Sequence, residues 1–362
     1  MLLPLESCII SVDKKSIQAQ EHGRAKEGRY DTMSAEQLVS HPCISRFPEN
    51  PVLTSAHVPF ASDLVFNAGL IAYKGGYAMV FRNDYGYIRA GSFSGTNIGL
   101  AFSPDGIHWQ VEEQPVFSVK NEEIRRVYDP RLTVIDGEIY MTFAVDTRHG
   151  LRGGIAHTDD LRHYDILSMS VPDNRNMVLF PEKYQGMYMR LERPMPVYSR
   201  GHRDRFDIWW SESPDLVHWG NSHLVAGVED FPFANDKIGP GAPPVLTNKG
   251  WLAITHTVDI DPSRGKNGWE DRWTKRYCAA VMLLDRDEPW KMLGRSRVPL
   301  LAPETDYETQ AGFRTNVIFP TAALPMKDGR LRIYYGAADT VIALAEAKID
   351  DLIALCLEGD QG

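Results

Sequence analysis

The stretch "SPDGIHW" (residues 103–109) decides the fold, because similar strings recur along the chain at a fixed spacing. They are "TDDLRHY" (158–164) and "SPDLVHW" (213–219), and each string has an aspartate four residues before an aromatic residue. The aspartates, 55 residues apart in both intervals, are Asp105, Asp160 and Asp215. We interpret each string as a turn between strands, in which the aspartate accepts backbone N–H groups and the aromatic ring packs between repeats.

Two looser copies of this string follow, "LDRDEPW" (284–290) and "AKIDDLI" (347–353). Between the strings, alternating apolar runs are joined by turns that contain glycine, a pattern typical of β-hairpins. The four clearest are "GLIAYKGGYAMVFR" (69–82), "LTVIDGEIYMTFAV" (132–145), "PPVLTNKGWLAITHTV" (243–258) and "AALPMKDGRLRIYYGAA" (322–338).

Hairpins that recur every ~50–70 residues predict an all-β fold, a five-bladed β-propeller. Helical periodicity is confined to "MSAEQLVSH" (33–41) and "LAEAKIDDLIALCLE" (344–358), which predict short N- and C-terminal helical extensions. We therefore expect residues 1–40 to form an N-terminal extension with a short helix. Residues 41–362 are expected to form a single five-bladed propeller that carries the catalytic site.

Composition excludes several classes of function. The chain of 362 residues is 43% hydrophobic and 24% charged, as in ordinary globular proteins, and its net charge of −9 disfavours nucleic-acid and anionic-membrane partners. No apolar run reaches the ~18 residues that a membrane helix needs. The four cysteines are dispersed without a C-x-x-C pair, which argues against a zinc site and favours a reducing, cytoplasmic location. We expect no metal site.

Function on a repeat fold is expected where the repeats differ, and in a propeller this is usually the central channel. The strings at hairpin ends that do not repeat contain one central carboxylate, Asp129 in "VYDPRL" (127–132), and a late one, Asp339. They also contain a set of basic residues, namely Arg82, Arg89, Arg131, Arg175, Arg193, Lys237 and His256. One carboxylate among many cations suggests a site for an anionic reactant.

These strings resemble glycoside hydrolase family 130, the five-bladed propeller β-mannoside phosphorylases and their hydrolase relatives. The resemblance runs from "RFPENPVLT" (46–54) to "AKIDDLIA" (347–354). Its most specific strings are "YDPRLT" (128–133), "LFPEKYQGMY" (179–188), "KIGPGAPPVLTNKGWL" (237–252), "LLAPETDYE" (300–308) and "NVIFPTAALPMKDGRLRIYYGAADT" (316–340).

The resemblance implies inverting phosphorolysis of a terminal β-linked mannose by inorganic phosphate, which gives α-mannose 1-phosphate reversibly. It places the general acid at Asp129, whose proton is thought to reach the glycosidic oxygen through a sugar hydroxyl. An acid that is protonated near neutral pH needs a raised pKa, so we expect one for Asp129. Since a facing guanidinium would oppose this, we expect Arg131 to turn away into a structural ion pair.

The resemblance also implies the binding residues. Those expected to bind phosphate are Arg89, Arg175, Lys237 and His256. Those expected to bind the substrate sugar are Asn67, Arg82, Tyr128, Glu192, Arg193, Phe319 and Asp339, with Tyr128 and Phe319 stacking on sugar faces. Many relatives have His-Arg-Pro where this chain has Glu192-Arg193-Pro194. We expect Glu192 to line the acceptor side, or to act as a base if the chain were a hydrolase.

Alternatives remain open at this point. β-1,2-Mannobiose or short β-mannooligosaccharides are the favoured substrates, with β-1,4-mannosides close behind. The first alternative is an inverting β-mannosidase on the same fold, and the second is a sugar-binding propeller without catalysis. No cofactor is expected beyond phosphate as co-substrate. A homodimer is the favoured assembly.

Overall fold

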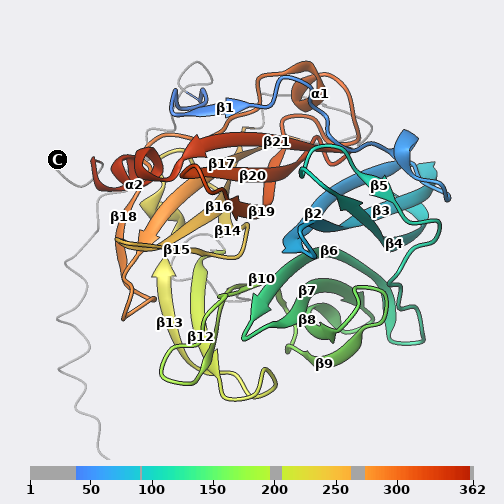
Figure 1. Ribbon diagram of the computed structural model, residues 1–362, viewed down its shortest axis with the longest axis horizontal. Coiled ribbons are helices and arrows are strands. Elements are labelled where there is room, and N and C mark those ends of the chain that lie inside the picture. Colours follow the sequence, from blue (N-terminus) through green and yellow to red (C-terminus); the bar gives the residue numbers. More distant parts are fainter. Residues whose placement is uncertain (1–37, 90–91, 196–205, 262–273, 359–362) are drawn as a thin grey trace, which may run out of the picture. The chain divides into compact units, whose positions relative to one another are not determined.

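The computed structural model describes residues 38–89, 92–195, 206–261 and 274–358, and these fold into five antiparallel sheets arranged as the blades of a propeller (Figure 1). Blade 1 contains β2 (Leu64–Tyr73), β3 (Gly76–Arg89), β4 (Ser92–Ser103) and β5 (Gln110–Val111). Blade 2 contains β6 (Ile124–Ile135), β7 (Glu138–Thr147), β8 (Gly150–Thr158) and β9 (Asp165–Met169). The predicted all-β propeller with five blades is confirmed.

The other blades follow the same order along the chain. Blade 3 contains β10 (Asn174–Leu179), β11 (Tyr188–Pro194), β12 (Ile208–Ser213) and β13 (Gly220–Ala226). Blade 4 contains β14 (Lys237–Pro240), β15 (Val245–Thr247), β16 (Gly250–Ile260), β17 (Lys275–Leu284) and β18 (Met292–Arg295). Blade 5 contains β19 (Ile318–Pro325), β20 (Arg330–Ala337), β21 (Val341–Lys348) and the early strand β1 (Ile44–Arg46).

The ring is closed by strands from the two ends of the propeller. Strand β1 pairs antiparallel with β21, and Ile44 lies opposite Ala347. A further bridge joins Leu53 to Ile342 of β21. Blade 5 is therefore completed by a strand that precedes blade 1 in the sequence, which closes the ring.

The repeated strings are turns that the aspartate stabilises, as predicted. Oδ1 of Asp105 accepts the backbone N–H groups of Ile107 and His108 at 2.8 and 2.9 Å. Asp160 and Asp215 do the same for the residues two and three positions ahead. The rings pack between blades: the ring of Trp109, for example, lies 6.3 Å from that of Tyr334 in blade 5.

In the looser copy the capping aspartate is Asp285, which accepts the N–H groups of Asp287 and Glu288. The hairpin turns are also confirmed. Asp136 and Gly137 join β6 to β7 with φ values of 53° and 88°, which suits a tight turn of two residues.

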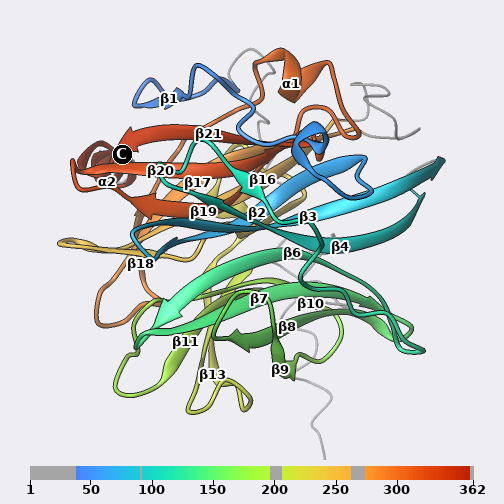
Figure 2. The ribbon, with the colours of Figure 1, turned by 45° about the vertical axis from the view of Figure 1, so that its right-hand side comes forward.

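The expected C-terminal helix is only half correct. The second part of that stretch is α2 (Ile349–Glu358), which packs against β17, β18 and β21 (Figure 2). The first part belongs to β21, because residues 344–348 pair with β20 on one side and residues 345–347 pair with β1 on the other. The expected helix at 33–41 lies largely outside the described residues, and residues 38–41 are not helical. The division of the chain at residue 40 stays a prediction.

The other helices of the described residues are short: α1 (Asp306–Thr309) and the 3₁₀ turns η2 (Ser55–His57) and η3 (Val228–Asp230). No helix among the described residues is long and apolar enough to cross a membrane.

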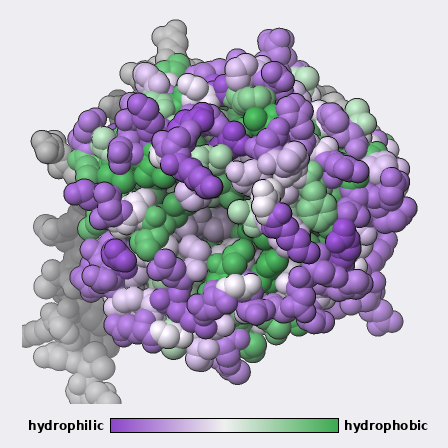
Figure 3. Space-filling model, viewed as in Figure 1, coloured by the Kyte–Doolittle hydropathy of each residue, from purple (hydrophilic) through white to green (hydrophobic). Residues whose placement is uncertain are grey.

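The two ends of the channel differ in chemistry. The innermost strands are β2, β6, β10, β14 and β19, which gather around the middle of Figure 1. Their C-terminal ends line an apolar cavity of about 450 Å³ that residues from all five blades surround, including Leu70, Leu132, Pro181, Val245 and Leu324. Of the candidate polar residues, Asn67, Arg175 and Lys237 lie nearer the N-terminal ends of three of these strands, and Asp129 lies in the middle of β6. Figure 3 shows one face of the molecule, where hydrophilic residues predominate and apolar residues gather around a central hollow.

Candidate active site

Bulges in the innermost strands of blades 1, 2 and 3 carry Asn67, Asp129 and Asn176. In each blade the register shifts at this point: between Phe66 and Gly69 in blade 1, and at the matching places in the other two blades. The three residues have φ values of 50°, 55° and 57°. Asn and Asp tolerate this left-handed conformation better than most residues, and a bulge redirects a side chain out of the regular pleat. Asp129 is therefore one member of a repeated structural position.

The Asp129 carboxylate is held by partners from blade 1. Its Oδ1 accepts hydrogen bonds from Asn67 Nδ2 at 2.8 Å and from Arg82 Nη1 at 3.2 Å. Arg82 is itself fixed by a bidentate pair with Asp84, at 3.1 and 2.6 Å. All four side chains are 9% exposed or less. The carboxylate is thus buried and oriented before any ligand binds.

The pKa of Asp129 differs from the expectation. Burial raises it, but Arg82, Arg131, the hydrogen bond from Asn67 and Arg175 together outweigh burial and lower the pKa below its ordinary value. The expected raised pKa is wrong for the protein without ligand. In this state Asp129 is a carboxylate at neutral pH.

Arg131 supports the bulge at Asp129 but forms no structural ion pair among the described residues. Its Nη1 donates to the backbone oxygen of Asp129 at 2.7 Å, and its Nε donates to that of Gly241 at 3.0 Å. Burial, with Arg175 nearby, lowers the pKa of Arg131 to about 10. The expected ion pair is wrong because the guanidinium binds carbonyl oxygens of blades 2 and 4 instead.

A cluster of basic side chains lies between blades 3 and 4. It consists of Arg175 on β10, Arg193 on β11, Lys237 on β14 and His256 on β16, and we call it the cation cluster. Arg193 Nη1 donates to Nε2 of His256 at 3.1 Å. Gly239 permits this contact, because a Cβ there would lie 2.5 Å from His256 Cε1. Arg193 was expected to bind sugar, but the structure places it with three of the four expected phosphate ligands.

The cation cluster is electrostatically strained. Burial and then Arg193, Lys275 and Arg175 lower the pKa of Lys237 to about 6, although Asp236 partly opposes this. Burial and Arg175 lower the pKa of Arg193 to about 9. Burial and the surrounding cations hold the pKa of His256 well below its ordinary value, so this ring is neutral. Repulsion of this kind is relieved when an anion binds.

Several buried polar atoms around the channel have no hydrogen-bond partner among the residues that the structure describes. In the cation cluster they are Nε of Arg175, Nε of Arg193 and Nδ1 of His256. Both polar side-chain atoms of Asn176, and Oδ1 of Asn67, are also buried without a hydrogen-bond partner among the described residues. Unpaired buried donors and acceptors are costly, and in functional sites water or ligand usually satisfies them.

The remaining expected sugar-binding residues also line the channel side of the blades. The hydroxyl of Tyr128 donates to Asp146 Oδ1 at 2.8 Å, and the guanidinium of Arg82 lies 4.9 Å from the centre of the Tyr128 ring. Phe319 packs 4.5 Å from the ring of His256. Asp339 accepts from Arg314 at 3.2 Å, and its pKa is raised mainly by burial, against the effect of Arg314 and Arg82.

Glu192 is not free to meet a substrate. Its carboxylate oxygens are 2.6 Å from Asn174 Nδ2, 2.7 Å from Arg190 Nη2 and 2.8 Å from Ser211 Oγ. The side chain is 4% exposed. Polar neighbours of its own blade already surround the carboxylate, so the expected place on the acceptor side, or a role as base, stays a prediction.

Arg89 is also separate from the other cations. It is exposed at the far end of β3, seven residues beyond Arg82, which is roughly 23 Å along an extended strand. The structure does not bring it together with the cation cluster.

Sequence reasoning missed Asp84, Asp146, Asn176, Lys275 and Tyr277. A signal existed for two of them. Arg82 and Asp84 are two residues apart and so share a strand face. If the residues of the two strands are paired outward from the Asp136–Gly137 turn, with one extra residue allowed for the bulge, Asp146 falls opposite Arg126. Lys275 and Tyr277 lie on β17 of blade 4, where Lys275 pairs with Asp236 at 3.0 Å and the Tyr277 ring lies 6.1 Å from that of His256. No local pattern in the sequence indicates these contacts between strands.

One group of residues with suitable geometry for a metal ion occurs among the described residues, namely Glu138, His157 and Asp159. It lies on blade 2, and its ligand atoms are within 4.8 Å of one another. Both carboxylates are exposed, and neither contributes to the channel.

Comparison with known proteins agrees with this geometry. A sequence model of the family described as beta-1,4-mannooligosaccharide phosphorylase matches residues 38–358. The chain is 34% identical to a beta-1,4-mannooligosaccharide phosphorylase of Ruminococcus albus, over 86% of this chain and 90% of that protein. It is 30% identical to a 1,2-beta-oligomannan phosphorylase of Thermoanaerobacter sp., over 85% of this chain and 98% of that protein.

A solved structure is also similar. The beta-1,2-mannobiose phosphorylase of Listeria innocua, in complex with beta-1,2-mannobiose, superposes with a TM-score of 0.74 at 25% identity. The alignment covers 86% of this chain and 99% of the Listeria chain.

Proposed function

Because the chain belongs to glycoside hydrolase family 130, we propose that it is a phosphorylase that transfers the terminal mannosyl unit of a β-mannoside to inorganic phosphate. The products are α-mannose 1-phosphate and the shortened sugar, and the reaction is reversible. Asp129 is the proposed general acid.

The observation that carries the proposal is the cation cluster close to the oriented carboxylate of Asp129, on which Arg175 acts directly. A hydrolase must activate water and needs a second carboxylate as base. Phosphate is already an anionic nucleophile, so it needs cationic donors rather than a base. Arg175, Arg193 and Lys237 provide charge, and the two guanidinium groups suit the geometry of phosphate oxygens.

The proton balance is consistent with a carboxylate at Asp129 in the free enzyme. A phosphate oxygen bonds to the anomeric carbon as the bond to the glycosidic oxygen breaks, and that oxygen must gain a proton. Hydrogen phosphate brings one proton, and mannose 1-phosphate leaves without it. Asp129 therefore acts as a relay, whose pKa rises when phosphate adds negative charge and offsets Arg175.

The mannosyl unit is proposed to bind on the side of the site away from the cation cluster. We assign Asn67, Arg82 and Asp339 to the mannosyl hydroxyls, since they surround the Asp129 carboxylate or lie close to Arg82. Tyr128 and Phe319 are assigned as apolar platforms for the sugar ring. Both β-1,2- and β-1,4-linked mannosides are substrates of the relatives by name, and the β-1,2 linkage remains our preference.

The proposal extends to the cellular location of the enzyme and to its oligomeric state. We place the enzyme in the cytoplasm, which is supported by dispersed cysteines, of which Cys43, Cys278 and Cys356 are free thiols. A homodimer remains the favoured assembly, and sedimentation of the purified protein would test it.

The test of function uses purified protein with β-1,2-mannobiose and β-1,4-mannobiose in separate reactions. Mannose 1-phosphate that forms only when phosphate is present supports phosphorolysis, and the substrate that reacts identifies the linkage. Release of free mannose at an equal rate without phosphate would mean a hydrolase. No release from either sugar would favour a binding propeller.

A further inference from the structure

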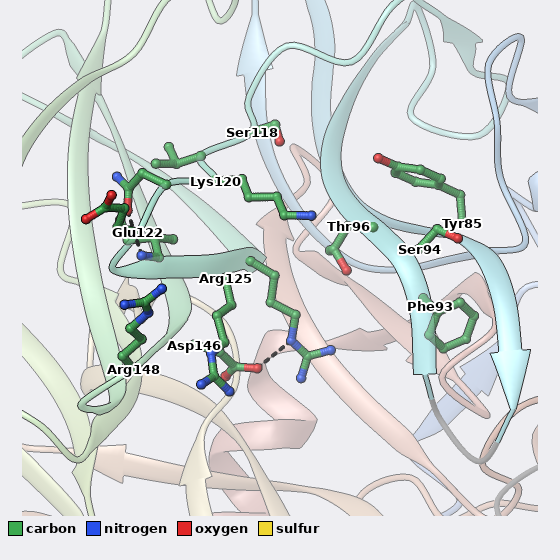
Figure 4. Close-up of a pocket in the computed structure, with 15 residues that line it drawn as sticks. Tyr85, Phe93, Ser94, Thr96, Ser118, Lys120, Glu122, Arg125, Asp146 and Arg148 are labelled. Atoms are coloured by element: carbon green, nitrogen blue, oxygen red, sulfur yellow. Dashed lines mark hydrogen bonds and ion pairs between the residues drawn. The ribbon is translucent and has the colours of Figure 1, made fainter.

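A second polar pocket opens next to the proposed mannosyl site, and it is not explained by the reaction itself. It has a volume of about 520 Å³ and lies between the β3–β4 hairpin of blade 1 and the loop that leads into β6 of blade 2 (Figure 4). Its lining includes Thr96, Arg126 and Asp146. We call it the side pocket.

The side pocket shares residues with the contacts of the proposed catalytic site. Thr96 Oγ1 donates to Asp84 Oδ1 at 2.7 Å, and Asp84 holds Arg82. Asp146 accepts from the Tyr128 hydroxyl, and the Arg126 guanidinium lies 4.8 Å from the centre of the Tyr128 ring. A sugar chain that places its mannosyl unit on Tyr128 therefore has the side pocket as a neighbour.

The charge of the side pocket is unusual for this protein. The lining of the side pocket contains four cationic side chains and two carboxylates, Glu122 and Asp146. Asp146 forms an ion pair with one of these cations, Arg126, at 2.5 Å. The other three cations, which have no carboxylate partner in the part of the chain that the structure describes, are Lys120, Arg125 and Arg148. The whole chain has a net charge of −9, so a local excess of positive charge needs an explanation.

The opposite wall is aromatic. In Figure 4, Tyr85 and Phe93 stand across the pocket from Arg125 and Arg148, and Lys120 extends towards Thr96. An aromatic wall suits the apolar face of a sugar ring, whereas a wall of unpaired cations suits an anionic substituent. A neutral sugar would contact the aromatic wall and would leave the wall of cations without a function.

We infer that the side pocket binds the leaving-group sugar and that this sugar carries an anionic group, a carboxylate or a phosphate. The inference rests on the proposed phosphorolysis and specifies its substrate class. In the reverse direction the same sugar is the acceptor for mannose 1-phosphate. Lys120, Arg125 and Arg148 are the residues that determine this preference.

The test is reverse phosphorolysis, with α-mannose 1-phosphate as donor and release of phosphate as the signal. Glucose and mannose are the neutral acceptors, glucuronate carries a carboxylate, and glucose 6-phosphate carries a phosphate. We expect a KM roughly tenfold lower for at least one anionic acceptor, and we expect added salt to reduce this advantage. The two anionic acceptors distinguish which group is recognised.

Variants complete the test. Lys120→Gln combined with Arg125→Gln should remove most of the ratio between anionic and neutral acceptors. Lys249→Gln is the matched control, because Lys249 is an exposed cation in the turn before β16 and outside the side pocket. Neutral acceptors used as well as anionic ones, or a preference that survives the double variant, would overturn the inference and leave phosphorolysis intact. No phosphate release with any acceptor would overturn both.

Discussion

Aspartates occupy two contrasting positions in this propeller. Asp215, in a repeated turn, is held by backbone N–H groups two and three residues ahead and by His218, which lower its pKa. Asp129, in the channel, is held by Asn67 and Arg82, which are 62 and 47 residues away. The first carboxylate stabilises its own turn. The second depends on blades 1 and 2 being assembled together.

The two positions differ in whether a repeat fold can carry catalytic residues there. The turns satisfy their own polar groups, so they can repeat with little change. The channel brings together one strand from each blade, so a different residue at the same bulge changes the site without changing the blade. Asn67, Asp129 and Asn176 share the bulge conformation, but only one of them is a carboxylate.

The largest expected effect separates the two positions directly. Asp129→Asn keeps the shape and the left-handed conformation but cannot carry a proton, so we expect phosphorolysis to fall by about 10³-fold. Loss of the buried charge beside Arg82 should also lower the Tm, so activity is compared well below the melting temperature of the variant. Steady-state kinetics with a β-mannobiose would check this, and a variant that retains more than a tenth of wild-type kcat would exclude Asp129 as the acid.

The next effect concerns the cation cluster. Lys237→Met removes one charge from the proposed phosphate site while keeping the length of the side chain. We expect the KM for phosphate to rise roughly 10- to 100-fold, as for the loss of a charged hydrogen bond. Lys249→Met is the matched control and should leave this KM unchanged. Equal KM values for Lys237→Met and wild type would remove Lys237 from the site.

A smaller effect is the pH dependence of phosphate binding. The pKa of Lys237 is about 6 without phosphate, so at pH 7.5 the amine is mostly neutral. An anion favours the charged form, so binding takes up a proton and the affinity falls as pH rises above about 6. In Lys237→Arg the residue stays charged. We expect phosphate binding to Lys237→Arg to take up fewer protons than binding to wild type, with a difference of at most about one proton per phosphate. Calorimetry in buffers of different ionisation enthalpy measures this number.

Phosphate itself titrates identically in both proteins, so the difference between them isolates Lys237. Equal proton uptake by wild type and Lys237→Arg would show that the amine is already charged before phosphate binds.

The smallest effect on activity is expected at the repeated turn. Asp215→Ala removes the acceptor for the N–H groups of Val217 and His218, which should lower the Tm by a few degrees. Activity should stay within about twofold of wild type below that temperature. Parallel measurements of melting and kcat would check this, and a loss of kcat as large as that of a channel variant would invalidate the distinction.

The sequence was most informative where structure is local. The repeated turns and the Asp-Gly hairpin depend on residues within a few positions, and their patterns predicted five blades correctly. The stretch 344–358 shows the limit: its first part has helical composition but is a strand, because pairing with β20 and β1 decides the outcome. Tertiary pairing overrode local propensity there.

The sequence supplied candidate residues for the site but not their electrostatics. The resemblance named Asp129, Arg175, Lys237 and His256, which the structure brings to the channel. It could not give the lowered pKa of Asp129, since that depends on guanidinium groups from several blades. The sequence suggested that Glu192 lines the acceptor side, but it did not show that Arg190, two residues away on the same strand face, pairs with it at 2.7 Å.

The central claim is that phosphate, and not water, attacks the anomeric carbon. The most direct measurement follows the purified wild-type enzyme with a β-mannobiose and phosphate by ³¹P and ¹H NMR. We predict that the phosphate signal is replaced by that of α-mannose 1-phosphate, and that no cleavage occurs without phosphate. Free mannose formed at the same rate in both reactions, with the phosphate signal unchanged, would contradict the account.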